Sequence, residues 1–349
     1  MKSNIGIYNK KIRHIHLEPT TDCNARCPQC PRTWKAGLQT HPSLPIDEWT
    51  AEELREVLSH DFFSGVERVL VNGNFGDIVK HSNPRQLIQV LIDKDLDTIE
   101  LRTNGGAQSI DFWKWLGTID NLTVEFGIDG LADTHHLYRR NTRFDVVIKN
   151  ARAFIESGGN ASWAMTVFKH NQHQVDECRE LSKEMGFTNF KMRPSTRWHK
   201  HQPLSILDKN QVESYKLEPA DSVKPDNLPK QPAQLTDIDC VVTYGSVYLS
   251  GTKRLWPCCW TEQRYMDSLM NDSLDTDDFI MEFVKKMGLP EDFNQITKYS
   301  IDHVINSGLF RTVEQSWSTT PFKACSSMCG KSSLFKLQQS LTENTETNK

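Results

Sequence analysis

Short runs of apolar and polar residues predict six β-strands in the first part of the chain, and the first of them alternates between the two kinds. The first stretch, Ile-Arg-His-Ile-His-Leu-Glu at 12–18, shows the pattern plainly. The other five predicted strands lie at 66–71, 98–103, 122–128, 161–168 and 187–192. The loops that follow these strands contain Cys, Gly, Asn and Asp.

Helical segments separate the predicted strands. Thr50 begins the first, at 51–58, and Glu53 completes a capping box. Further helices are predicted at 86–92, around Trp113 and Trp115, at 144–157 and at 172–185. Alternating strands and helices with short loops predict an α/β fold with a parallel sheet. Six units are too few for a complete eight-unit barrel, which leaves an open doubly wound sheet or a partial barrel. In either fold the loops after the strands share one site.

The second part of the chain has a different composition. Residues 203–232 are rich in Pro, Lys, Asp and Gln and predict a linker. A hairpin is expected at 246–256, followed by helical segments within 275–315. The chain therefore divides into an α/β domain at 12–200, a linker at 201–235, a smaller module at 236–335 and a disordered tail at 336–349.

Composition excludes some classes of protein. The 349 residues include 41 Lys and Arg and 45 Asp and Glu, so the net charge is 41 − 45 = −4. This charge, without a basic stripe, argues against a nucleic-acid-binding module. No run of about 18 apolar residues is present, so no membrane segment is expected. The start of the chain lacks an apolar signal segment, which predicts a cytoplasmic location.

The nine cysteines are clustered, and in a reducing compartment clustered cysteines favour metal binding. Cys23, Cys27 and Cys30 form a C-x3-C-x2-C loop after the first predicted strand. Three thiolates can hold three corners of a cubane iron–sulfur cluster and leave the fourth iron open. The alternative is a zinc loop that recruits His14 or His16 from the preceding strand. Cys178 shares one helical face with apolar residues and is expected in the core.

The segment from Glu18 to Arg32, which includes these three cysteines, closely resembles the cluster loop of radical S-adenosylmethionine enzymes. The resemblance implies a [4Fe-4S] cluster whose open iron binds S-adenosylmethionine, with reductive cleavage to a 5′-deoxyadenosyl radical that abstracts a substrate hydrogen. It also implies a flavodoxin- or ferredoxin-type electron donor. Gln29 departs from the family pattern, because an aromatic residue usually precedes the third cysteine.

Loops after later strands resemble cofactor-binding positions of the same family. Residues 73–77 resemble its Gly-Gly-Glu-Pro loop, which implies that backbone groups there bind the methionine ammonium. Taken alone, this segment also fits an ordinary strand-to-helix turn. Asn104 and Asp129 resemble contacts to ribose or the sulfonium end, and Arg193 fits either a cofactor contact or a surface position. The cofactor-binding residues implied are Gly73, Asn74, Gly76, Asp77, Asn104, Asp129 and Arg193.

A second set of cysteines, Cys240, Cys258, Cys325 and Cys329, supplies four thiolates, enough to ligate every iron of a second cluster. A structural zinc is the alternative, and Cys259 competes with Cys258 for one position. The set resembles the twitch or SPASM-like auxiliary domain of radical S-adenosylmethionine enzymes, although the final C-x3-C departs from the usual C-x2-C. The resemblance implies a partial (β/α)6 TIM-like barrel with a small C-terminal β-hairpin and helical auxiliary-cluster domain.

A fully ligated second cluster is suited to accepting an electron from a substrate radical. This predicts an oxidoreductase acting on an unactivated C–H bond, with a peptide or protein side chain favoured as substrate. A dehydrogenase of a small alcohol or sugar and a non-catalytic iron–sulfur electron-transfer protein are the alternatives. Oxidation also requires a general base, for which Tyr138, His136 and Lys169 are candidates by placement.

Overall fold

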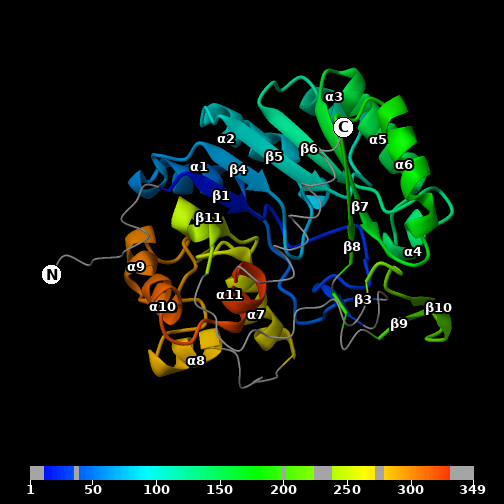
Figure 1. The fold of residues 1–349 in the computed structure, drawn as a ribbon. Coiled ribbons are helices and arrows are strands. Elements are labelled where there is room, and N and C mark those ends of the chain that lie inside the picture. The colour runs from blue at the N-terminus through cyan, green and yellow to red at the C-terminus, as the bar shows by residue number, and fades with distance from the viewer. Residues whose placement is uncertain are drawn as a thin grey trace.

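The computed structural model describes residues 12–34, 39–195, 197–198, 202–223, 238–271 and 279–330. Its main sheet has the strand order β12-β11-β1-β4-β5-β6-β7-β8 (Figure 1). The six predicted strands are present and parallel to their neighbours. Their bounds are β1 His14–Leu17, β4 Arg68–Val71, β5 Thr98–Thr103, β6 Leu122–Gly127, β7 Asn160–Val167 and β8 Asn189–Pro194.

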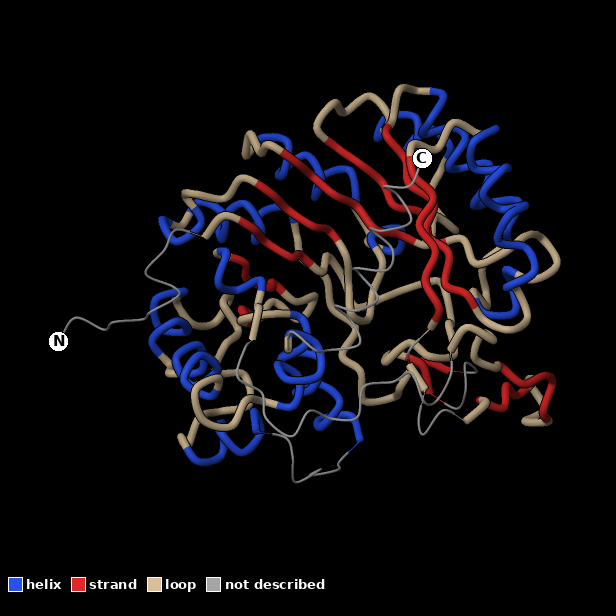
Figure 2. The backbone as a smooth tube through the Cα atoms, in the orientation of Figure 1, coloured by secondary structure: helices blue, strands red, loops and turns tan. Residues whose placement is uncertain are grey.

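Helices connect these strands and cover one face of the sheet (Figures 1 and 2). The Thr50 side chain accepts from the backbone of Glu53, and the Glu53 side chain accepts from the backbone of Thr50, which confirms the predicted capping box. The predicted helix at 172–185 begins instead as the 3₁₀ turn η5. The bounds are α1 Ala51–Ser59, η3 Asp61–Phe63, η4 Ile78–Lys80, α2 Pro84–Asp93, α3 Ile110–Leu116, α4 His135–Tyr138, α5 Phe144–Glu156, η5 Gln172–Gln174 and α6 Val175–Glu184.

Alternation along the strands gives the sheet two different faces. We call the apolar face, which packs against α2, α3 and α5, the outer face, and the more polar opposite face the inner face. On β5 the buried Ile99 and Leu101 alternate with the half-buried Glu100 and Arg102. The apolar set packs with the helices in one core that also contains the fully buried Cys178, as expected. Charged side chains on the inner face of a parallel sheet are unusual, because such sheets normally have both faces buried among apolar groups.

The C-terminal module joins the same sheet. Strand β11 (Ser246–Leu249) pairs in parallel with β1, and β12 (Leu255–Trp256) returns antiparallel to β11, which confirms the predicted hairpin. The helices α7, α8, α10 and α11 lie on the side of the sheet opposite to α2, α3 and α5 (Figure 1). The remaining bounds are η7 Val241–Tyr244, α7 Cys259–Asn271, α8 Phe279–Lys286, α9 Ile301–Asn306, α10 Leu309–Ser316 and α11 Lys323–Cys329.

Two short hairpins were not predicted. Strands β2 (Thr33–Trp34) and β3 (Gln39–Thr40) pair within the first long loop. Strands β9 (Leu204–Leu207) and β10 (Glu213–Leu217) pair inside the segment predicted as a linker. The Pro-rich composition concealed this hairpin, because the apolar residues that form it are few. The domain boundaries stay a prediction, and the predicted tail at 336–349 lies outside the described residues. Where the chain is described, no helix is long and apolar enough to cross a membrane.

Candidate functional site

The loop after β1 gathers three thiols at the carboxyl end of the sheet. The Cys23 sulfur accepts from the backbone N–H of Ala25 at 3.4 Å, and the Cys30 sulfur lies 4.0 Å from the carbonyl oxygen of Asn74. Desolvation, the Asp77 carboxylate and the other two thiols all raise the pKa of Cys23. No three His, Cys, Asp or Glu side chains in the described ranges stand in a geometry that holds a single metal ion. The Cys23, Cys27 and Cys30 thiols lie close enough to act on one another electrostatically, and none of them is in a disulfide.

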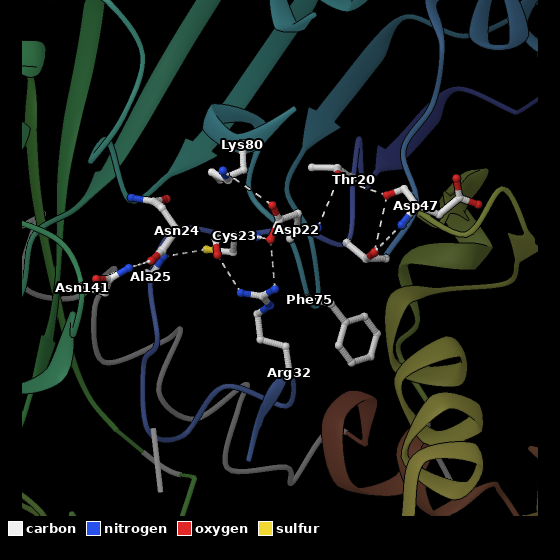
Figure 3. Close-up of polar contacts among 12 residues, drawn as sticks. Thr20, Asp22, Cys23, Asn24, Ala25, Arg32, Asp47, Phe75, Lys80 and Asn141 are labelled. Carbon is white, nitrogen blue, oxygen red and sulfur yellow. Dashed lines mark hydrogen bonds and ion pairs between the residues drawn. The ribbon is translucent and has the colours of Figure 1, made fainter. Parts of the chain in front are cut away.

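Polar contacts fix the shape of this loop (Figure 3). The Asp22 carboxylate accepts from the backbone N–H of Cys23 at 2.8 Å and forms ion pairs with Arg32 at 3.2 Å and Lys80 at 3.7 Å. The buried Arg32 also donates to the carbonyl of Cys23 at 2.7 Å. Neither Arg32 nor Lys80 was singled out from the sequence, although Arg32 closes the motif that carried the resemblance. These contacts hold the first cysteine in place without using its sulfur.

Glu18, like Arg32 and Lys80, was not singled out from the sequence. Its fully buried carboxylate accepts from the backbone N–H groups of Phe75, Gly76 and Gly251 at 2.7, 3.1 and 3.0 Å. It also accepts from the Tyr248 hydroxyl at 3.0 Å. Desolvation raises the pKa of Glu18, and these four donors oppose the rise. The carboxylate therefore fastens the loop after β4 and the hairpin turn to the end of β1.

The loop after β4 packs too closely for side chains at two positions. A Cβ on Gly76 would lie 1.7 Å from the carbonyl oxygen of Thr20, and one on Gly73 would lie 2.6 Å from that of Gly76. Between them, Asn74 donates to the carbonyl of Cys259 at 2.8 Å and to the Glu262 carboxylate at 2.9 Å. The predicted cofactor loop thus touches the beginning of α7, a contact that no local sequence signal indicates.

Asp77 and Asn104, both predicted cofactor residues, are brought together. Asp77 accepts from the Thr103 hydroxyl at 2.7 Å and from the backbone and side-chain amides of Asn104 at 2.8 and 2.7 Å. The Asn104 side-chain nitrogen lies 3.6 Å from the Cys23 sulfur. These contacts direct the Asp77 carboxylate toward the end of β5, and its predicted contact with the cofactor stays a prediction. Asp77 therefore orients Asn104 beside the first cysteine.

Asp129 is fully buried and bound to Arg139. Its carboxylate accepts from Arg139 Nε at 2.6 Å and from the backbone N–H of Thr166 at 2.5 Å. The Arg139 guanidinium reaches the Cys27 sulfur at 4.0 Å. Desolvation raises the pKa of Cys27 to about 11, and Arg139 opposes this rise. The contact of Arg139 with Cys27, a predicted cluster ligand, is a role that the structure adds.

An apolar cap covers the cysteine loop on the side of β9 and β10. We use this name for Tyr138, Phe168, Ile206 and Leu217, which pack with Cys27 and Ala25. Gln29 binds the segment at 195–197 of the same chain. Its side chain donates to the carbonyl of Arg197 at 2.7 Å and accepts from the Ser195 hydroxyl at 2.6 Å. The unusual residue before the third cysteine therefore binds the segment after β8.

The three candidate bases are dispersed. The Tyr138 ring lies in the apolar cap, 4.4 Å from the Phe168 ring, and desolvation raises its pKa. His136 is exposed on α4, and Lys169 is exposed and paired with Glu218 at 2.6 Å. The structure does not bring these three side chains together. Arg193 lies 3.8 Å from Glu125 on the inner face, and its predicted contact with the cofactor stays a prediction.

The four cysteines of the second set converge between η7, the start of α7 and α11. Hydrogen bonding to Cys329 and burial raise the pKa of Cys240. Burial and the Cys240 thiol raise the pKa of Cys258 to about 11. Burial, with Cys258 and Cys240 nearby, raises that of Cys325 to about 12.

Cys259 points elsewhere. Desolvation, the Cys258 thiol and the Glu262 carboxylate raise the pKa of Cys259, and its thiol acts electrostatically on Arg102 of β5 and Tyr248 of β11. The thiol therefore faces the inner face of the sheet rather than the other four cysteines. The Cys258 thiol lies near Cys240 and Cys325, which favours Cys258 over Cys259, and the choice of ligand between them stays a prediction.

No protein-family model matches the sequence, and no curated protein matches it either. Solved structures do match. SuiB of Streptococcus suis superposes with a TM-score of 0.53 at 13% identity, over 74% of this chain and 64% of SuiB. Native anSMEcpe, with bound S-adenosylmethionine and the Cp18Cys peptide, superposes with a TM-score of 0.52 at 14% identity, over 95% of this chain and 94% of its own.

The chain has the fold of radical S-adenosylmethionine enzymes with a C-terminal SPASM or twitch region. The predicted α/β partial barrel is thereby confirmed. The chain spans slightly less than two thirds of the length of SuiB. In this fold the gathered thiols of Cys23, Cys27 and Cys30 lie at the carboxyl ends of the strands, where α/β proteins place their sites.

Proposed function

We propose that the protein is a radical S-adenosylmethionine oxidoreductase that acts on an unactivated C–H bond. The observation that supports this most strongly is the grouping of the Cys23, Cys27 and Cys30 thiols beside Asn104 and Arg139 at the carboxyl ends of the strands. Three clustered thiolates suit a cubane with one open iron. A loop zinc would need a fourth ligand, and the candidate His16 instead contacts the carbonyl of Asn72 at 2.7 Å.

The residues present fit the implied cofactors. Cys23, Cys27 and Cys30 would hold a [4Fe-4S] cluster, and Cys240, Cys258, Cys325 and Cys329 would hold an auxiliary iron–sulfur cluster. With S-adenosylmethionine bound, these groups would supply reductive cleavage to a 5′-deoxyadenosyl radical, hydrogen abstraction and removal of one further electron. A flavodoxin- or ferredoxin-type protein would donate the first electron.

The chain's own residues would organise this site. Arg139, held by Asp129, places a positive charge beside the Cys27 thiolate and so favours its ionised form. The apolar cap excludes water from one side of the cysteine loop. The backbone of residues 73–76, brought close by its glycines, would bind the ammonium group of S-adenosylmethionine.

A peptide or protein side chain is the favoured substrate. Two structures with this fold contain peptides: SuiB bound to the precursor peptide SuiA, and anSMEcpe with the Cp18Cys peptide. A small alcohol or sugar remains the second substrate class within the same chemistry.

The experiment is anaerobic reconstitution followed by iron counting and measurement of 5′-deoxyadenosine. We expect about eight irons per chain, the content of two cubanes, and slow formation of the nucleoside with a strong reductant. Replacing Cys23, Cys27 and Cys30 with Ala should abolish nucleoside formation and remove about half of the iron.

Cys178→Ala is the matched control, because this buried thiol lies on α6 away from both sets. It should retain the iron and the nucleoside product. A protein that binds only zinc, or a triple variant that cleaves S-adenosylmethionine as well as the parent, would contradict the proposed function.

A further inference from the structure

A group of charged side chains lies on the inner face of β5, β6 and β8. The Glu125 carboxylate is 3.7 Å from Arg102, 3.2 Å from Lys191 and 3.8 Å from Arg193. Arg102 is also paired with Glu100 at 2.7 Å. We call these five residues the inner charge group. Glu125 reaches β8 across β7, which presents only the small side chains Ser162 and Ala164 opposite these positions.

Three cations surround two carboxylates, so the inner charge group has a net charge of 3 − 2 = +1. This excess stands out in a chain whose overall charge is −4. Burial alone would raise the pKa of Glu125, but Arg102, Lys191 and Arg193 hold it below its usual value. Glu125 is therefore ionised at neutral pH and still does not balance its three neighbours.

The cations remain open to a further partner. The side chains of Arg102, Lys191 and Arg193 are 37%, 39% and 46% exposed, whereas Glu125 is only 9% exposed. Arg102 also lies two residues before Asn104, which contacts the first cysteine. The excess positive charge therefore lies on the inner face, close to the predicted cofactor loops and on the side of the sheet opposite to α2, α3 and α5.

We propose that Lys191 and Arg102 of the inner charge group bind a carboxylate of the substrate. This inference rests on the proposed function, because it concerns the substrate of the same site. Glu100 engages Arg102 Nε at 2.8 Å and one terminal nitrogen at 2.7 Å, and the remaining N–H groups of the guanidinium and the mobile ammonium of Lys191 both suit a carboxylate. The carboxylate belongs either to an acidic side chain of a peptide or to a small free acid, and the two sources are separable by experiment.

The test is equilibrium dialysis of the reconstituted protein with S-adenosylmethionine under anaerobic conditions. The probes are acetyl-Gly-Glu-Gly-amide and its uncharged counterpart acetyl-Gly-Gln-Gly-amide, with glutarate and its uncharged diamide glutaramide as the small-acid pair. We expect the acidic member of at least one pair to bind five-fold or more tightly than its amide, with a preference that weakens as salt increases. The pair that shows the preference identifies the source of the carboxylate.

Lys191→Gln should reduce that preference at least three-fold, while Lys191→Arg should retain it. Lys191→Gln leaves Glu125 paired with Arg102 and Arg193, so the fold is expected to survive. Lys183→Gln on α6 is the matched control, since this lysine is exposed and lies on an outer helix. Equal binding of acid and amide in both pairs, absence of binding, or a preference unchanged in Lys191→Gln would overturn the inference.

This measurement does not depend on turnover. Formation of 5′-deoxyadenosine without an acid preference would contradict the carboxylate site alone. An acid preference in a protein that forms no nucleoside would contradict the proposed function alone.

Discussion

The Glu18 carboxylate accepts a hydrogen bond from the backbone N–H of Gly251 at 3.0 Å, and so joins the end of β1 to the turn between β11 and β12. The same carboxylate binds the backbone of Phe75 and Gly76. One buried side chain therefore connects the cysteine loop, the predicted cofactor loop and the C-terminal module. Positions far apart in sequence depend on it for their relative placement.

Replacing Glu18 with Ala should strongly destabilise the protein. The change leaves the buried N–H groups of Phe75 and Gly251, the half-buried one of Gly76, and the Tyr248 hydroxyl without their acceptor. Because hydrogen bonds to charged groups contribute about 1.5–3 kcal/mol each and do not add fully, we expect a total loss of about 3–5 kcal/mol in the free energy of unfolding. Urea denaturation of the parent and of Glu18→Ala measures this loss of unfolding free energy.

Glu56→Ala, at an exposed position on α1, is the control and should change stability by no more than about 0.5 kcal/mol. A Glu18→Ala protein as stable as this control would show that the four donors find other acceptors.

Gly76→Ala should disturb the cysteine loop directly. The added methyl group would meet the backbone of Thr20, which cannot move aside as a flexible side chain can. We expect a loss of stability above about 2 kcal/mol and lower iron content after reconstitution. Gly288→Ala provides the comparison: its φ of +62° disfavours Ala, but nothing lies within 4 Å of the added carbon. That change should cost only about 1 kcal/mol and leave the iron content unchanged. Similar effects of the two substitutions would show that conformation, not the contact with Thr20, limits position 76.

The sequence predicted the barrel strands well because their periodicity is local. β5 was predicted at its observed bounds, and the Thr50 capping box also depends on residues only three positions apart. The pairing of β11 with β1 was not predictable in this way, because His14 and Ser246 meet only after the whole barrel has formed. Strand patterns indicate which residues form strands, not which edge they join.

The same distinction applies to the site. The spacing of Cys23, Cys27 and Cys30 indicated a site because all three lie within one loop. The role of Glu18 depends on donors contributed by two distant loops, so its position beside the motif gave no sign of it. Likewise, Asn104 becomes the neighbour of Asp77 only through the pairing of β4 with β5, so no local pattern indicates their contact.

Substitution of the two adjacent cysteines should separate their roles. Cys258 lies with Cys240 and Cys325, whereas Cys259 faces the inner side of the sheet. Cys258→Ala should therefore lower the iron bound by the auxiliary set, seen as a loss approaching four irons per chain, roughly one cubane. Cys259→Ala should retain the full iron content and the charge-transfer absorbance near that of the parent. The reverse result would place Cys259 among the ligands.

Acidification should destabilise the protein through His135. This buried ring accepts the backbone N–H of Asp129 through Nδ1 at 3.2 Å, while its Nε2 contacts the Thr142 hydroxyl at 3.1 Å. A nitrogen that accepts a hydrogen bond cannot be protonated, and burial lowers the pKa of His135 from 6.5 to about 4. Between these two values the unfolded chain binds a proton that the folded protein does not. The stability that the neutral His135 ring contributes is therefore complete above pH 6.5 and decreases as the pH falls toward 4.

The expected decrease is about 3 kcal/mol, because a difference of about 2.5 pKa units corresponds to 1.36 kcal/mol per unit. Urea denaturation at a series of pH values between 7.5 and 4 measures it, with pH values chosen about half a unit apart. His135→Asn keeps an acceptor oxygen but does not titrate, so its stability should fall less steeply over this range. His136→Asn, at the exposed neighbouring position, should keep the slope of the parent. Equal slopes for the parent and His135→Asn would show that other groups, chiefly carboxylates, account for acid destabilisation.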